Sequence, residues 1–576
     1  MMFHKVSLAH IALSIGFAVL AMMPVAYAQQ APNGGSLLQQ LQQEKQLKNP
    51  GVQFENKTEE PAQDSQDAGG LKVLIKTVRF EGNVNVTTEE LQAVFANYVD
   101  KEYTFSGLEK LAGLVGEIYR KKGLWAKGVL PEQTLAEGEL LIRVVEGKLG
   151  SLRIEHQEER LRISEERAKA YAMDGQEGDV FSIDSFTQAI KALDDVPGVT
   201  AAAVLAPGQT EGETDVIVRM ANTPMFTGSV RADNHGSRAT SWNYLRLGGF
   251  LNVDSPFGFG EQFNFIGIFS RGSLVASAGA SVPIGVRGIR AGLNYTALTY
   301  ELGYPLEDLG ASGESQVASG YLSIPFVRKD NLAVLGQLNV NHGDYLDEVN
   351  ENDVTADKML DVASASLTTY WPDRLLGGGV SSITPIYTFG DLDRSGAPED
   401  LALDAATANT QGQFHKLSLQ ANREQVVHEK SQLWFSFLGQ VASKNLDSSQ
   451  KISLGGASAV RAYPGGEGSG DQGAIVTLEY RYSLSDKLQG IAFYDQGWVR
   501  QNHTTWDGWN DGSSAPNAYS ISGYGLGIKW RPLPSVEVVG YVADRIGNNP
   551  AADPDGNDND GTKFSPRGWL SIVTQF

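Results

Sequence analysis

The feature that most restricts the fold of this chain is a long series of strand-like segments, from residue 224 to the C-terminus, in which apolar and polar residues alternate. In one of them Tyr524, Leu526 and Ile528 take alternate positions. No stretch beyond the N-terminus approaches the roughly 18 apolar residues of a membrane-spanning helix. Such a chain enters a membrane only as a closed barrel, because every backbone group must be paired there. A soluble β-sandwich is the alternative, but apolar, aromatic-rich faces that continue over so many segments argue against it.

The length of this region sets the number of strands. A membrane strand and its connection together take about 22 residues, so residues 224–576 accommodate about 16 strands. Short turns such as Arg531 to Pro534 are expected at the inner end of the barrel. Long polar loops, such as His503 to Asn517 and Asn548 to Lys563, are expected at the outer end.

The N-terminus has the features of a cleaved export signal, which we place at residues 1–28. Lys5 precedes the short apolar run Ile11 to Val19, and the small residues Ala26 and Ala28 fit a cleavage site. An uncleaved anchor helix is the alternative, but the apolar run is short for a membrane span. The chain has no cysteine, which fits an oxidising compartment. The net charge of −21 argues against nucleic acid as a partner.

Residues 29–70 are predicted to form a short helix followed by a polar linker. Ser36 is placed to cap the helix, and Pro50 follows its end. Its apolar residues are Leu37, Leu38, Leu41 and Leu47. A lone amphipathic helix on a tether is either a frayed terminus or a movable plug, and the sequence leaves both open.

Residues 71–147 and 148–223 repeat one order of strands and helices, which indicates an internal duplication. The first unit is predicted to contain strands at 73–80, 125–130 and 140–145 and helices at 87–98 and 108–119. The second is predicted to contain strands at 152–154, 199–205 and 214–220 and helices at 164–173 and 183–193.

Two motifs in the barrel region mark candidate functional residues. In the loop from Leu454 to Pro464 one Arg stands among Gly, Ala and Tyr, where the backbone can fold tightly. The candidates in this loop are Val460, Arg461, Ala462 and Tyr463. Downstream, the period of a strand places Asp495 and Gly497 on one face and Tyr494 on the other. If Tyr494 faces lipid, Asp495 faces the lumen.

The chain ends on the alternating strand Gly568 to Phe576. A terminal aromatic residue on such a strand resembles the assembly signal of outer-membrane barrels. We therefore expect Phe576 to be recognised by the barrel assembly machinery during biogenesis.

The loop and strand motifs resemble the Val-Arg-Gly-Tyr/Phe loop and the Phe-x-Asp-x-Gly strand of the Omp85 superfamily. The two repeats resemble POTRA domains, so the likeness narrows to two-partner secretion transporters of the TpsB type, such as the filamentous-haemagglutinin and haemolysin exporters. The segments Leu130 to Gln133, Val145 to Gly147 and Asp233 to Gly236 also resemble that family. The resemblance covers the chain from the mature N-terminus to Phe576.

The resemblance implies a mostly β fold in the bacterial outer membrane. A transmembrane barrel at residues 224–576, surrounded by outer-membrane lipid, would follow two α+β POTRA domains at residues 71–147 and 148–223. The POTRA domains would lie in the periplasm, and a plug helix within residues 29–70 would occupy the pore at rest.

The resemblance also implies a function. POTRA domains would bind an unfolded, large secreted partner, whether an adhesin, a cytolysin or a toxin, and the barrel would secrete it. Two other functions stay open: an Omp85-type factor that inserts other barrels, and a passive porin.

In this family the long loop folds back into the barrel, which would pair Arg461 with Asp495. The alternative is that Asp495 pairs with Arg481 on the adjacent strand, where Glu479 also faces the lumen. The family usually has Gly where this chain has Ala462, so a positive φ at that position would strain the loop tip.

Signatures of enzymes are weak or missing. The eight His are scattered, and neither a Gly-x-Ser-x-Gly motif nor a phosphate loop occurs. We expect no enzymatic activity, no cofactor and no metal. The stretch Asp553 to Gly561 superficially resembles a Ca²⁺ loop, but Asp558 stands where an EF-hand requires Gly. We interpret this stretch as a solvated outer loop.

Overall fold

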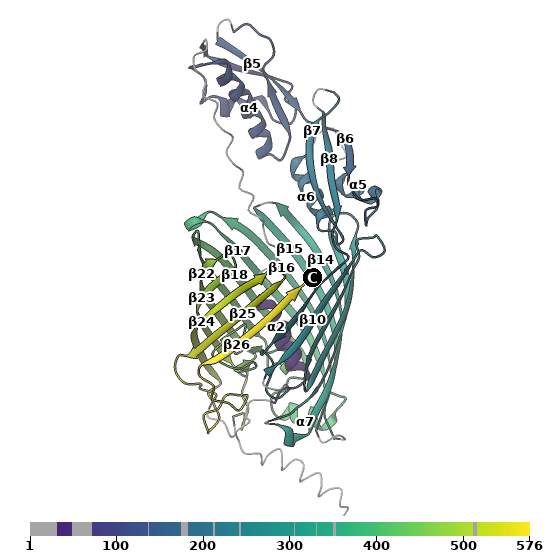
Figure 1. Ribbon diagram of the computed structural model, residues 1–576, viewed down its shortest axis with the longest axis vertical. Coiled ribbons are helices and arrows are strands. Elements are labelled where there is room, and N and C mark those ends of the chain that lie inside the picture. Colours follow the sequence, from purple (N-terminus) through teal and green to yellow (C-terminus); the bar gives the residue numbers. More distant parts are fainter. Residues whose placement is uncertain are drawn as a thin grey trace, which may run out of the picture.

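A computed structural model describes residues 31–48, 72–135, 138–173, 182–210, 213–240, 244–304, 306–329, 331–349, 353–510 and 515–576. Figure 1 shows two small units stacked above one end of a large barrel, with the N-terminal helix inside the barrel. The predicted signal at residues 1–28 and the predicted polar linker after the helix lie outside the described residues. Within the described residues, none of the helices has the length and hydrophobicity needed to span a bilayer.

The barrel is closed and antiparallel, and it contains 16 strands, which confirms the predicted fold class and strand number. Around the barrel the strands are β9 (Phe226–Asp233), β10 (Arg246–Asp254), β11 (Gln262–Ser270), β12 (Ser273–Ile284), β13 (Ile289–Glu301), β14 (Ala311–Lys329), β15 (Leu332–Val349), β16 (Asp353–Asp373), β17 (Gly379–Asp393), β18 (Gly412–His428), β19 (Ser431–Ala442), β22 (Gln472–Ser485), β23 (Leu488–Arg500), β24 (Ala518–Leu533), β25 (Val536–Arg545) and β26 (Arg567–Gln575). Each strand pairs with its neighbour in sequence, and β26 pairs with β9 to close the ring.

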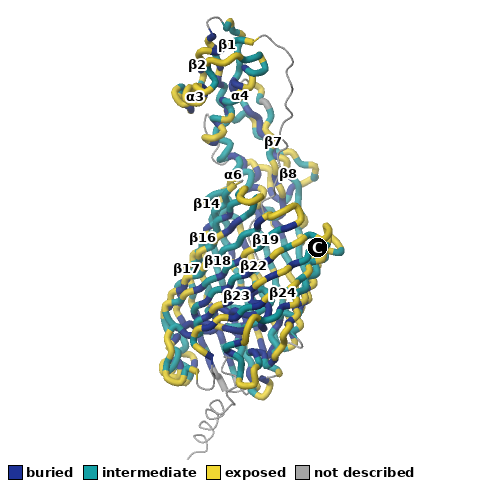
Figure 2. The backbone as a smooth tube through the Cα atoms, turned by 90° about the vertical axis from the view of Figure 1, so that its left-hand side faces the viewer, coloured by how far each residue is buried: buried dark blue, intermediate teal, exposed yellow. Residues whose placement is uncertain are grey.

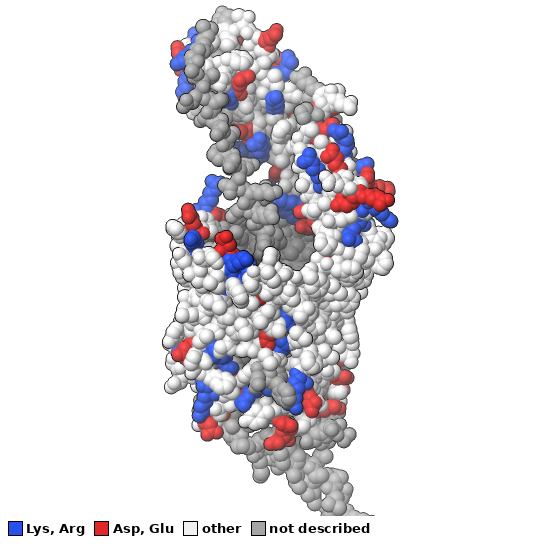
Figure 3. All heavy atoms as spheres, viewed as in Figure 1, with Lys and Arg blue, Asp and Glu red and all other residues white. Residues whose placement is uncertain are grey.

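The alternation seen in the sequence separates the two faces of the barrel. Tyr524, Leu526 and Ile528 are exposed on its outer surface, whereas Asp495 and Glu479 are buried inside. The wall in Figure 3 is mostly uncharged, and Lys, Arg, Asp and Glu gather toward its ends and on the units above. An apolar wall with polar groups inside is the arrangement that lipid requires of a barrel.

The two units at the end of the barrel each have a three-stranded sheet covered by helices. The first contains β1 (Val73–Ile75), β2 (Thr77–Glu81), α3 (Thr88–Phe95), β3 (Lys101–Tyr103), α4 (Phe105–Lys121), β4 (Ala126–Val129) and β5 (Glu139–Glu146). The second contains β6 (Lys148–Glu155), α5 (Glu165–Met173), α6 (Ile183–Asp194), β7 (Val199–Pro207) and β8 (Glu213–Asn222). Their sheets have the orders β2-β5-β4 and β6-β8-β7, so both units share one topology. The short strand β3 was missed by the sequence analysis, because three residues give no periodicity.

Local signals start α3 and α6 where the sequence predicted, whereas α4 begins at Phe105, three residues before its predicted start. The Thr87 side chain accepts a hydrogen bond from the Glu90 amide, and Glu90 reaches back to the Thr87 amide, which forms a capping box. Ser182 caps α6 in the same way through its hydroxyl. Helix α6 faces the barrel, where Arg328 of β14 forms an ion pair of 2.6 Å with Asp195. This ion pair links the second unit to the barrel end.

The N-terminal helix α2 (Gly34–Lys48) lies inside the barrel, as Figure 1 shows. The prediction that Ser36 caps it was wrong, because the helix begins two residues earlier. Asn33 takes that role: its side-chain oxygen accepts from the Ser36 amide at 2.9 Å, and the Ser36 hydroxyl folds back onto Asn33.

The connections differ between the two ends of the barrel. The turn after β24 lies at the end that carries the two units, where the Gln575 amide donates to the Ser535 carbonyl. The long loops after β23 and β25 lie at the opposite end, and Figure 2 shows that buried positions gather toward that end. The prediction of a solvated loop at residues 553–561 holds for Pro554 to Gly556, which are exposed, but was wrong for Asp558 and Asp560, which are buried and bind arginines. The loop therefore folds inward, over the lumen.

Candidate functional site

The connection between β19 and β22 folds back into the barrel and crosses its interior. It contains the helical turn η6 (Ser448–Gln450) and the short strands β20 (Ile452–Ser453) and β21 (Ser469–Gly470). The tip is a compact turn, in which the Val460 amide donates to the Leu454 carbonyl at 2.9 Å and the Tyr463 amide donates to the Val460 carbonyl at 3.1 Å. Leu454, Val460 and Tyr463 are fully buried. The tip of this loop is thus packed as tightly as a protein core.

Arg461 leaves this tip toward the wall and meets two carboxylates. Its Nη2 and Nε donate to the two oxygens of Asp495 at 2.8 and 2.9 Å, and its Nη1 donates to Glu479 at 2.7 Å. Asp495 also accepts from the Arg461 amide at 3.1 Å and from the Thr477 hydroxyl at 3.0 Å. The guanidinium lies over the Phe493 ring at 3.4 Å. A bidentate, buried contact of this kind fixes the position of both partners.

The alternative pairing predicted for Asp495 does not occur. Arg481 forms its ion pair with Glu479 at 2.6 Å, and Asp495 pairs with Arg461 instead. Glu479 therefore joins both arginines, so the four side chains form one chain of charges across β22, β23 and the loop. Because Arg461, Asp495 and Glu479 are shielded from water, removal of Arg461 or Asp495 is expected to cost about 3 to 5 kcal/mol.

Two glycines of the wall make room for the loop tip. A Cβ atom at Gly497 would lie 3.0 Å from Val460 and 3.1 Å from Leu454. A Cβ atom at Gly523, on β24, would lie 2.6 Å from the Cβ of Ala462. Ala462 is not among the non-glycine residues with a positive φ, so the expected strain at this position does not arise. The methyl group of Ala462 instead occupies the space that Gly523 leaves open.

Some residues of the site were not found from the sequence. Trp569 of β26 donates from Nε1 to the Arg461 carbonyl at 2.7 Å, and the Tyr541 ring lies 4.8 Å from the guanidinium. Gly523 was also missed. Each stands at a lumen-facing position of its strand, but the sequence does not tell which of these positions the loop touches.

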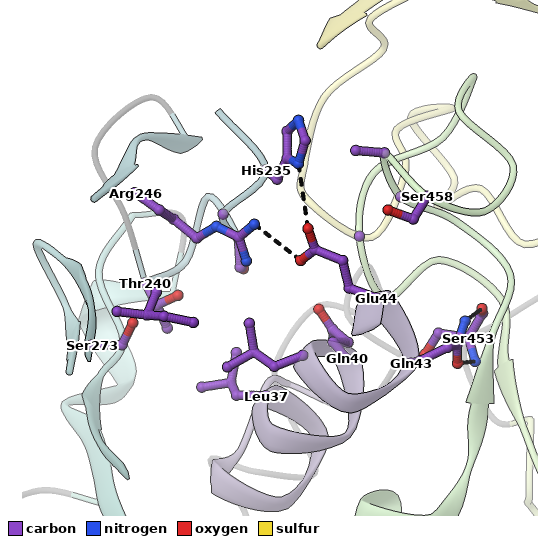
Figure 4. Close-up of a pocket in the computed structure, with 18 of the residues that line it drawn as sticks. Leu37, Gln40, Gln43, Glu44, His235, Thr240, Arg246, Ser273, Ser453 and Ser458 are labelled. Atoms are coloured by element: carbon purple, nitrogen blue, oxygen red, sulfur yellow. Dashed lines mark hydrogen bonds and ion pairs between the residues drawn. The ribbon is translucent and has the colours of Figure 1, made fainter. Parts of the chain in front are cut away.

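Helix α2 lies beside this loop and is attached on two sides, as Figure 4 shows. Glu44 binds Arg231 at 2.9 Å and Arg246 at 3.0 Å on β9 and β10, and His235 lies 3.6 Å from the same carboxylate. On the other side, the Gln43 side chain donates to the Ser453 carbonyl at 2.6 Å and accepts from the Ser453 amide. The helix is thus attached both to the wall and to the loop.

The four predicted leucines of the helix face different neighbours. Leu37 and Leu38 are buried against side chains of the wall, with Leu41 packed at the edge of the same cluster. Leu47 packs against the cluster formed around Val460 and Tyr463. The helix therefore fills space between wall and loop, and it is not a frayed end in this structure.

The predicted assembly signal lies at the seam of the barrel. The Phe576 amide donates to the Gly228 carbonyl at 3.0 Å, and the Gly228 amide donates back at 3.1 Å. The ring lies over Gly228, where a Cβ atom would approach it to 2.6 Å. Phe576 thus closes the pairing of β26 with β9; its recognition during assembly stays a prediction.

Comparison with known proteins identifies the family. Residues 212–530 match the family described as haemolysin secretion/activation protein ShlB/FhaC/HecB, and residues 73–147 match the ShlB-type POTRA domain. The chain belongs to this family. It is therefore a two-partner secretion transporter of the outer membrane, which confirms the first of the three functions considered from the sequence. Its POTRA domains lie in the periplasm, and such transporters act with a secreted partner protein.

Relatives along the whole chain agree with this assignment. The heme/hemopexin transporter protein HuxB of Haemophilus influenzae (strain KW20/Rd) is 26% identical over 98% of both chains. The outer membrane transporter CdiB of Dickeya dadantii (strain 3937) is 25% identical over 75% of this chain and 76% of its own. The solved structure of CdiB from Escherichia coli matches 95% of this chain and 99% of that chain, with 20% identity and a TM-score of 0.69.

Proposed function

We propose that this transporter holds its pore closed with two lumenal elements, helix α2 and the Arg461 loop, and opens it for one large secreted partner protein. The observation that carries this proposal is the buried contact of Arg461 with Asp495 and Glu479, which holds a loop across the lumen by charge pairs rather than by a continuous sheet. Side-chain contacts can be broken and remade, whereas a strand of the wall cannot leave without opening the barrel.

The POTRA domains are proposed to bind the unfolded partner before export. In the sheet of the second domain β7 and β6 are edge strands, each paired on one side only among the described residues. Val204 and Leu205 of β7 are partly exposed. An extended segment of the partner could pair with such an edge through its backbone, and side chains on alternate positions would give specificity.

Helix α2 is proposed to leave the lumen when the partner enters. Its attachment consists of separate polar contacts at Glu44 and Gln43 and of a limited apolar face around Leu37 and Leu38. A helix held in this way can dissociate as one body without unfolding the wall. The leucines Leu37, Leu38, Leu41 and Leu47 would then be the residues that seat it.

The gating role is tested by changing the charges at the loop tip. We expect Arg461→Ala and Asp495→Ala to reduce secretion of the partner protein, because each change leaves the other charge buried without its main partner. The barrel itself should still insert, since its strands keep their backbone pairing. Arg481→Ala is a matched control, because Arg481 binds Glu479 but does not hold the loop.

The measurement compares partner protein in the medium with folded barrel in the outer membrane, where the folded form is recognised by its altered migration on unheated gels. The partner to follow is the secreted protein that this transporter exports, which is first sought among the reading frames beside its gene. Normal secretion by both Arg461→Ala and Asp495→Ala would reject the gating role of this pair.

A further inference from the structure

The loop between β25 and β26, Ile546 to Pro566, buries polar groups that a solvated loop would expose. Asn549, Asp558 and Asp560 are at most 8% exposed. Buried polar groups are retained where they are hydrogen-bonded, so the partners of these side chains indicate what the loop holds.

One set of partners lies on the loop that carries Arg461. The Glu467 carboxylate is fully buried, and it accepts from Asn549 Nδ2 at 3.0 Å and from the Asn559 amide at 2.9 Å. Asn559 Nδ2 also donates to the Gly465 carbonyl at 3.3 Å. The guanidinium of Arg545, at the end of β25, lies 4.9 Å from the Tyr463 ring. The β25–β26 loop therefore contacts the Arg461 loop at Gly465 and Glu467, beyond its tip, and the end of β25 contacts it at Tyr463.

The second set of partners lies on both sides of the barrel seam. Asp558 forms ion pairs with Arg545 and with Arg567 of β26, and the distance to Arg567 is 3.3 Å. Asp560 accepts from Arg567 at 3.0 Å and from the Tyr244 hydroxyl at 2.8 Å. Tyr244 belongs to the connection between β9 and β10, on the other side of the seam. The loop is thus anchored to the wall at β25, at β26 and next to β10.

We propose that residues 546–566 form a clasp that holds the Arg461 loop inside the barrel from the outer end, and that export requires this clasp to release Glu467. The inference rests on the proposed function, in which the Arg461 loop moves. A polypeptide that leaves the lumen outward must pass the level at which Glu467 meets Asn549 and Asn559. Displacement of the Arg461 tip alone would leave the far end of its loop attached to the clasp.

The first test measures the clasp without any assay of export. Asn549→Ala removes the amide that binds Glu467, whereas Asn557→Ala is a matched control, because its amide binds Asp553 within the clasp itself. In the full chain in lipid nanodiscs, we expect Asn549→Ala to speed hydrogen–deuterium exchange of residues 454–470 by about tenfold, the change expected when a buried carboxylate loses a donor. Asn557→Ala should leave that exchange unchanged. Equal exchange in the wild type and Asn549→Ala would overturn the proposal.

The second test asks whether the clasp must open. The chain has no cysteine, so Gly465→Cys with Asn559→Cys provides the only two thiols, and a short, reducible thiol crosslinker can join them. A pair at Asp553 and Asn557, both within the clasp, is the control. The conductance of the variant is measured in planar bilayers in KCl. We expect the channel crosslinked between residues 465 and 559 to lose its large openings and to regain them when the crosslinker is reduced.

The outcomes separate the two proposals. Unchanged openings of the crosslinked 465–559 pair, together with unchanged exchange in Asn549→Ala, would overturn the clasp while leaving a channel that opens. If Asn549→Ala speeds exchange of residues 454–470 but the crosslink changes neither the openings nor the amount of secreted partner protein, the clasp holds the loop and the proposed movement of that loop is wrong.

Discussion

The packing of Ala462 against Gly523 gives a prediction whose size follows from the structure. In Gly523→Ala the new methyl group would lie 2.6 Å from the Cβ of Ala462 and 3.1 Å from the Asp544 carbonyl oxygen. Because two carbon atoms at van der Waals contact lie about 3.5 to 4.0 Å apart, the loop tip or strand β24 must move by about 1 Å. Overpacking of a tight core costs about 1 to 3 kcal/mol. We therefore expect Gly523→Ala to destabilise the loop or the barrel by that amount.

The second half of this prediction is that Ala462→Gly partly restores the stability lost in Gly523→Ala. Ala462→Gly alone should cost about 0.5 to 1 kcal/mol, through the greater freedom of glycine in the unfolded chain. In the double variant the methyl group of residue 523 would occupy the space that Ala462 leaves. We expect the double variant to be about 1 to 2 kcal/mol more stable than the sum of the single changes predicts, which is a coupling typical of residues in contact. The close contact with the Asp544 carbonyl would keep the rescue incomplete.

The assay is urea-induced unfolding of the refolded protein in lipid vesicles, followed by tryptophan fluorescence, for all four members of the cycle. Secretion of the partner protein is measured in parallel and should fall in Gly523→Ala and recover in the double variant. Additive free energies, or a Gly523→Ala variant within about 0.5 kcal/mol of the wild type, would show that Ala462 and Gly523 do not pack as described.

Three further predictions follow from other parts of the chain. Glu44→Gln should raise the conductance of planar bilayers, because helix α2 loses its ion pairs with the wall. Deletion of residues 36–48 should raise the conductance as well, and an unchanged conductance in the deletion would reject the role of the helix as a plug. Burial raises the pKa of the Glu146 carboxyl, but hydrogen bonds from the Tyr119 hydroxyl and from Asn85 and Val84 outweigh it and hold that pKa below its usual range. The ionised Glu146 carboxylate should therefore stabilise the first POTRA domain fully above about pH 4.5, and this stabilisation should be lost as the pH falls through the lowered pKa. Hydrogen exchange of residues 72–135 measures the loss. In Glu146→Gln the exchange should no longer change over this pH range. Phe576→Ala should lower the yield of folded barrel, because the ring no longer covers the glycine opposite it at the seam.

Much of the fold was set by local sequence. The alternation of residues such as Leu526 and Ile528 determined that the C-terminal region is a barrel, because period two separates a lipid face from a lumen face. The same period placed Asp495 inside. The repeated order of elements before residue 224 indicated two similar domains, and the helix starts near residues 87 and 183 followed from the spacing of their apolar residues.

Local sequence did not determine which lumenal charges pair with one another. Family resemblance implied Arg461 as the partner of Asp495, whereas periodicity also allowed Arg481, and only the path of the loop decides between them. That path depends on the two wall glycines beneath the loop tip and on Trp569, which lies on the last strand. Residues so far apart in sequence meet because closure of the barrel brings β26 beside β9 and places several strands around one lumen.

The sequence by itself therefore determined the architecture, the inner and outer faces and the residues available to the lumen. Only the tertiary structure decided which of those residues touch. It replaced the expected strain at Ala462 with a fitted contact against Gly523, and it turned a loop that looked solvated into one that holds Glu467. The physical reason is that periodicity is a property of neighbouring residues, whereas the contacts of an inward-folded loop depend on the shape of the closed wall around it.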